Sequence, residues 1–165
     1  MQPPPTSLAS DDRLRHELTA LLRGRQAHVD AHTVLDQIPL HAVNQRPGGA
    51  EHSLWQLAEH LRITQADILA FCHPGYIERD WPADYWPRQP ASAGDWEACL
   101  DSFFADFDAL LALAASGDLF AEFAWAPGYT LLRELLLAAD HNAYHLGQIV
   151  QLRRALGLWP PAEST

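Results

Sequence analysis

The sequence predicts an all-α fold, a four-helix bundle with long crossover loops. Four segments of twenty to thirty residues each carry apolar residues at helical spacing, and no run shows a convincing strand-like alternation. Two of the connections between these segments are long, so the helices can cross rather than simply alternate up and down. We expect one domain over residues 11–160, with a flexible N-terminal tail at 1–10 and a C-terminal tail at 161–165.

The first two helices are expected in the N-terminal half of the chain. Leucines recur at helical spacing from residue 11 to about 37, with Gly24 as the one glycine inside and a proline just beyond. The second helix should begin after Ser53, because Gln56 three residues later completes a capping box. It should end near Cys72, since a proline follows two residues later.

The other two helices are expected at about 93–115 and after Thr130, which can cap the last helix. Between the second and third helices, residues 73–92 carry several prolines together with two tyrosines and two tryptophans. The prolines exclude a helix, and the aromatic side chains argue against a floppy linker. We expect an ordered loop laid over the bundle, and it could line a pocket mouth or a subunit contact.

Composition excludes several classes of function. The chain has 165 residues, 48% of them hydrophobic, and a formal net charge of −10. It is long enough to bury a core without a metal clip, and its charge would on average repel nucleic acid or an anionic membrane. The N-terminus lacks a signal-peptide pattern and no segment approaches the length of a membrane span, so we expect a cytoplasmic protein with neither nucleic acid nor membrane as partner.

Histidines in two helices predict a metal site. His141 and His145 are four residues apart on the last helix, so both imidazoles lie on one face and can bind one ion. They border the apolar stripe, where an unpartnered imidazole would cost free energy. His60, near the middle of the second helix, would complete a three-histidine site with an open position. Gly147, unfavourable within a helix by roughly 1 kcal/mol relative to Ala, suggests that a neighbouring element approaches closely.

The residues around this pair limit the chemistry. A zincin protease needs a glutamate directly after the first histidine, and Asn142 stands there. Glu134 is about 10 Å along the helix from His141, which is too far for both side chains to bind the same metal ion. It is a candidate catalytic or substrate-contacting residue, or simply a solvated glutamate.

The remaining histidines are expected to be mostly at the surface. His28 and His32 repeat the four-residue spacing, and could form a second site, add a ligand, or be a core-edge histidine and a surface one. Surface positions are expected for the other four, which lie in loops or near helix ends: His16, His41, His52 and His73.

Two stretches, "SLWQLAEHL" and "DHNAYHLGQI", resemble the DinB-like (YfiT-like) superfamily of metal-dependent proteins. The resemblance runs from the first helix to about Pro160. It implies a four-helix bundle, often a homodimer, in which His60, His141 and His145 bind a divalent metal such as zinc or nickel. Many members have a basic residue directly after the last ligand histidine, and this chain has Leu146 there. A function that depends on that positive charge is therefore not implied for this chain, whereas the three ligands are unaffected. The family's name comes from DNA-damage induction, which is no reason to infer DNA binding here.

Characterised relatives include bacterial thiol-dependent transferases and isomerases, so the resemblance implies a small-molecule substrate and a low-molecular-weight thiol as cofactor. A metal deprotonates a coordinating thiol, which prepares a nucleophile at neutral pH. Two alternatives stay open. One is a hydrolase, since zinc held by three histidines lowers the pKa of bound water to about 7. The other is a non-catalytic protein that binds a metal or a small ligand.

Overall fold

The computed structural model describes residues 10–161 and is mostly helical, which confirms the all-α class. The predicted tails fall outside this range apart from residues 10 and 161. Within the described part of the chain no helix is both long and apolar enough to cross a membrane. The elements are α1 (Ser10–Arg23), α2 (Ala31–Leu35), α3 (Leu40–Val43), α4 (Leu54–Phe71), α5 (Ala93–Ser116), β1 (Glu122–Phe123), β2 (Ala126–Thr130) and α6 (Leu131–Ala155).

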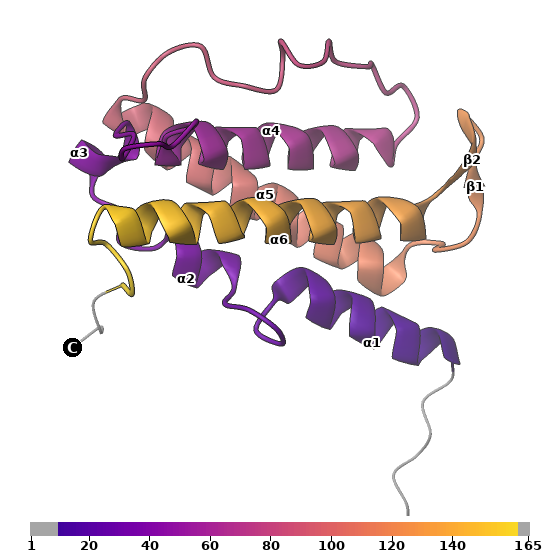
Figure 1. Cartoon of the computed structure of the whole chain (residues 1–165). Coiled ribbons are helices and arrows are strands. Elements are labelled where there is room, and N and C mark those ends of the chain that lie inside the picture. The colour runs from indigo at the N-terminus through magenta and orange to yellow at the C-terminus, as the bar shows by residue number, and fades with distance from the viewer. Residues whose placement is uncertain (1–9, 162–165) are drawn as a thin grey trace, which may run out of the picture.

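The helices α4, α5 and α6 pack against one another, and α1 packs against α5 and α6 (Figure 1). Their buried side chains form two apolar clusters. One lies around Leu61, Phe103 and Ile149, and the other around Leu110 and Leu135. The contact between α4 and α6 positions the candidate site, because its residues come from these two helices.

Two predicted helix starts are confirmed. The Ser53 hydroxyl accepts a hydrogen bond from the Gln56 amide, and the Gln56 side chain accepts one from the Ser53 amide, which is a complete capping box at the start of α4. Thr130 caps α6 through the amide of Arg133. The third helix also lies where it was predicted, at Ala93–Ser116.

The prediction of one helix over residues 11–37 is wrong. The chain leaves the helix at Arg23, and Gly24 and Arg25 adopt φ values of 73° and 68°, which a right-handed helix cannot contain. Asp30 then caps the separate helix α2 by accepting a hydrogen bond from the Thr33 amide. Apolar residues keep their helical spacing on both sides of this break, so the periodicity of the sequence alone did not indicate it.

Two smaller elements were not predicted. Helix α3 lies in the expected loop before α4, and strands β1 and β2 form an antiparallel hairpin between α5 and α6. The pairing is short and irregular, and so few residues cannot show a clear strand alternation.

The proline-rich segment 73–92 lies over α4, as predicted for a loop laid over the bundle. It leaves the end of α4 and returns along that helix to the start of α5 (Figure 1). The indole of Trp55 in α4 donates a hydrogen bond to the carbonyl of Gln89, 2.8 Å away. This long connection therefore covers the helix that carries His60.

Candidate metal centre

The structure brings together His60, His141 and His145. His60 is in the middle of α4, and the two other histidines lie one turn apart on the facing side of α6. Each imidazole offers one nitrogen, and these three atoms all lie within 4.8 Å of one another. In the described residues this is the one group of three or more potential ligands that could hold an ion.

Hydrogen bonds at the outer nitrogens fix the orientation of two of the rings. Nδ1 of His60 lies 2.9 Å from the carbonyl oxygen of Tyr85, and Nδ1 of His145 lies 2.7 Å from Oε1 of Gln148. Both oxygens can only accept, so each Nδ1 carries the proton and each Nε2 has a lone pair. This is the usual arrangement of metal-binding histidines, whose second nitrogen donates to a carbonyl or similar acceptor.

The distance between two of the inner nitrogens fits a shared ion. Nε2 of His60 and Nε2 of His141 are 3.1 Å apart. Two nitrogens bound to one tetrahedral ion at about 2.1 Å each would be roughly 3.4 Å apart. Nδ1 of His141 is buried and makes no hydrogen bond within residues 10–161. This pair of nitrogens therefore fits a shared divalent cation, and the third nitrogen lies within 4.8 Å of both.

The surroundings keep all three histidines neutral, which is the form that binds a metal. Burial, and to a smaller extent the charged forms of His145 and His60, lower the pKa of His141 to about 3. Burial also lowers the pKa of His60 and of His145. A proton competes poorly with a cation for these nitrogens at neutral pH.

Sequence reasoning missed the residues that cover His60. The Trp86 ring, from the loop over α4, is stacked on the rings of His60 and His52, with centroids 4.1 Å apart in both cases. His52, which we expected at the surface, is partly buried, and its charged form would lower the pKa of His60 and His145. The abundance of aromatic residues in 73–92 was the one signal in the sequence that could have indicated such contacts.

Glu134 lies outside the histidine group, as predicted, but it is not solvated. Its side chain is only 2% exposed and forms an ion pair with Arg133 at 2.6 Å. It lines a cavity of about 550 Å³ bordered by α4, α6 and β2, together with Asp67 and Tyr129. Its carboxylate therefore lies at the wall of this cavity, largely covered by its neighbours.

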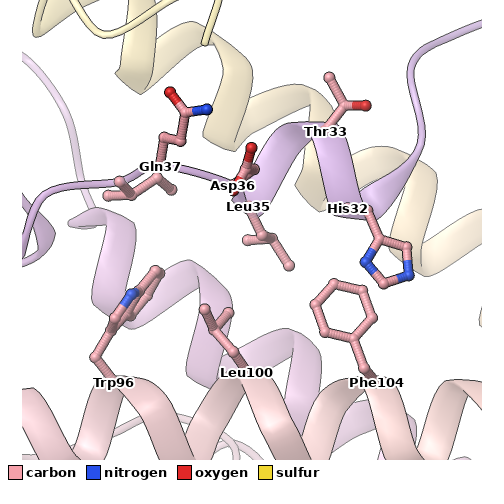
Figure 2. A pocket seen from close by; sticks show the side chains of 9 residues that line it. His32, Thr33, Leu35, Asp36, Gln37, Trp96, Leu100 and Phe104 are labelled. Atoms are coloured by element: carbon pink, nitrogen blue, oxygen red, sulfur yellow. The ribbon is translucent and has the colours of Figure 1, made fainter. Parts of the chain in front are cut away.

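His28 and His32 belong to no group of potential ligands within the described range. The His32 ring is exposed and stacks on Phe104 with centroids 3.9 Å apart, at the edge of a cavity of about 430 Å³ lined also by Trp96 and Leu100 (Figure 2). Nδ1 of His28 lies 2.9 Å from the carbonyl of its neighbour Val29. A second site with both histidines is thus not formed.

The expected close approach of a neighbouring element to Gly147 is not seen. A Cβ atom built on Gly147 would meet no atom within 4 Å. The residue is exposed on the outer side of α6. Close packing within the chain therefore does not explain this glycine.

Comparison with known proteins identifies a family. Residues 12–149 match the family model described as the DinB superfamily. This region contains all three histidines and most of the helical core. Neither a curated protein nor a solved structure gives a match to the chain.

Proposed function

The chain belongs to the DinB superfamily, and from this premise we propose that it is a metal-dependent enzyme that transfers a low-molecular-weight thiol to a small electrophile. His60, His141 and His145 would hold the divalent ion, with zinc or nickel as the best candidates. The observation that supports this most is the convergence of three neutral imidazoles, one nitrogen each, within 4.8 Å. Three protein ligands leave a further position for an exogenous molecule.

When bound, a divalent ion would lower the pKa of a coordinated thiol so that it is deprotonated at neutral pH. The residues around it have separate tasks. The Tyr85 carbonyl and the Gln148 amide oxygen orient two of the ligand rings. Trp86 covers one face of His60 and excludes water there. In the overall reaction the sulfur forms a bond to an electrophilic carbon, the leaving group departs with its electron pair, and the thiol proton passes to solvent.

Glu134 is a candidate contact for the substrate at a distance from the sulfur. It is two helical turns, about 10 Å, from His141, and its carboxylate lines the cavity beside Arg133. A carboxylate paired with an arginine can bind hydrogen-bond donors of a substrate, but it is too far along the helix to act on the atom bound at the histidines.

The proposal also includes the finer features implied by the family. These are a four-helix bundle built from α1, α4, α5 and α6, a homodimer and a cytoplasmic location. The acidic net charge of −10 supports a small-molecule substrate rather than nucleic acid or an anionic membrane.

A thiol-transfer assay with a model electrophile tests the proposed reaction. The protein, loaded with zinc or nickel, is mixed with 1-chloro-2,4-dinitrobenzene and a panel of biological thiols, and thioether formation is followed by absorbance. We expect thiol-dependent turnover that is lost in His145→Ala and kept in His41→Ala, which changes an exposed histidine.

Two other results would contradict the proposal. Hydrolysis of an activated ester without thiol, lost in His145→Ala, would instead support the hydrolase. Metal binding with neither activity would support a non-catalytic binding protein.

A further inference from the structure

A third cavity lies on the side of α6 opposite His141 and His145. It has a volume of about 420 Å³ and is bordered by the loop before α2, the outer face of α6 and Trp159. Gly147, which lines it, follows His145 by two residues and so points about 200° away around the helix. A molecule in this cavity would not reach the inner nitrogens of His60, His141 and His145. The cavity is therefore a separate site from the metal centre.

Gly147 has no evident structural role within residues 10–161. It lies within α6, and its backbone is not in the left-handed region that would require glycine. At such a position glycine costs roughly 1 kcal/mol relative to alanine. Because a Cβ would meet nothing in the described structure, the missing side chain does not make room for another element. The missing side chain does leave the part of the cavity next to Gly147 open.

The walls of the cavity are apolar. Val29 from the loop and Leu146 and Val150 from α6 contribute aliphatic side chains, and Trp159 contributes its indole. The Trp159 ring is held in place by the buried guanidinium of Arg153, whose Cζ lies 5.3 Å from the ring centroid. The wall is therefore anchored to the fold.

The polar side chains that line the cavity are those of His28, Gln151 and Arg154, and the arginine is the one fixed charge among them. Arg154 lines it, and no carboxylate of residues 10–161 forms an ion pair with this arginine. This arginine is exposed beside an apolar wall and has no acidic partner among residues 10–161, so it is open to a carboxylate, which a guanidinium binds with two parallel hydrogen bonds. His28 also lines the cavity and adds an imidazole.

From these observations we propose that the cavity between α6, the loop before α2 and Trp159 binds an organic carboxylate with an apolar body about the size of an aromatic ring. The carboxylate pairs with Arg154, and the apolar body lies over Gly147 against Trp159. The cavity volume is within the range of small-molecule sites.

Calorimetric titration of the full chain with three matched compounds tests this proposal: 4-phenylbutyrate, 4-phenylbutan-1-ol and 4-phenylbutylamine. We expect the carboxylate to bind at least tenfold more tightly than the alcohol and the amine to bind most weakly. Arg154→Gln should remove the preference for the carboxylate, and Arg154→Lys should keep part of it. His145→Ala should bind as the unchanged protein does, because the metal centre is on the other side of α6.

Gly147 provides the steric test. Gly147→Leu should weaken binding of both the carboxylate and the alcohol at least tenfold, because the new side chain occupies the space where the apolar body lies. Gly147→Ala should weaken binding while raising the unfolding temperature, which shows that the loss is not caused by unfolding. Equal binding of carboxylate and alcohol, or unchanged binding in Gly147→Leu, would overturn the proposal. So would a dimer in sedimentation that Gly147→Leu dissociates, since the face would then belong to a second copy of the chain.

Discussion

At the scale of single residues, the proposed centre depends on where each imidazole proton lies. The carbonyl of Tyr85 and the amide oxygen of Gln148 hold protons at the outer nitrogens of His60 and His145, so that lone pairs meet between the helices. Burial favours the neutral ring in each case. The site is thus arranged for a cation before any cation is bound.

Removing the acceptor at His145 should weaken metal binding. In Gln148→Ala the His145 ring is free to rotate, and its proton can move to the other nitrogen. Mutating a residue that hydrogen-bonds to a metal ligand typically lowers the metal affinity 10–100-fold. Competition for the metal with a chromophoric chelator measures the affinity of each variant. Gln151→Ala, an exposed glutamine on the same helix, is the matched control and should keep its affinity. Equal affinities for both variants would mean that Gln148 does not orient the ligand.

Metal-free protein should lose stability as the pH falls below about 6.5. In the folded chain the pKa of His141 is lowered from its ordinary value of 6.5 to about 3, mainly by burial. Between these values the unfolded chain binds a proton that the folded chain does not, so the free energy of unfolding decreases as the pH falls. Urea denaturation between pH 7 and pH 4 measures the slope.

The control for this pH dependence is His141→Gln, which cannot titrate. Its free energy of unfolding should fall less steeply with decreasing pH than that of the unchanged protein, by up to about 1.4 kcal/mol per pH unit. Identical slopes for the two proteins would contradict a neutral, buried His141.

Much of the site could be predicted at this scale, because spacing on a helix determines which side chains share a face. His141 and His145 follow directly from that rule, and His60 from its place beside an apolar stripe. Trp86 and the Tyr85 carbonyl could not be predicted, since a loop that folds back on a helix has no regular spacing.

At the scale of elements, capping residues were the most reliable signals. Ser53 with Gln56 begins α4 and Thr130 begins α6, both as predicted. The break between α1 and α2 was missed because it depends on positive φ values at Gly24 and Arg25, and arginine gives no hint of such a conformation.

The capping box of α4 should contribute measurably to stability. Ser53→Ala removes the oxygen that accepts from the Gln56 amide, in a residue that is 3% exposed, and should cost about 1 kcal/mol. Urea denaturation gives the change. Ser102→Ala, an exposed serine within α5, should change stability little or raise it slightly. Comparable losses for both serines would show that the cap is not important.

At the scale of the whole molecule, Arg153 connects α6 to two other parts of the chain. Its guanidinium donates to the carbonyls of Val34 at 2.7 Å and Leu158 at 3.1 Å, and the residue is 1% exposed. Burial lowers its pKa, while Asp36 opposes this shift. Helix α2 and the segment after α6 are therefore held against the bundle by one side chain.

The neighbouring arginines provide a matched pair for this contact. Arg153→Met removes the donor to the buried hydrogen bond with the Val34 carbonyl and to the part-buried one with the Leu158 carbonyl, and should cost about 3 kcal/mol. Arg154→Met changes an exposed side chain and should alter stability by less than about 0.5 kcal/mol. Thermal or urea unfolding measures the stability of each variant and so distinguishes the two effects. A small effect of Arg153→Met would mean that α2 is held mainly by its apolar contacts.

The central claim is that α4 and α6 together hold one divalent ion through three histidines. The most direct measurement is the metal content of purified protein after loading with zinc or nickel and removal of free ions. We predict one ion per chain in the unchanged protein and in His41→Ala, and none retained in the His60→Ala, His141→Ala double variant. If the unchanged protein retains no more metal than the double variant, the three-histidine centre does not exist.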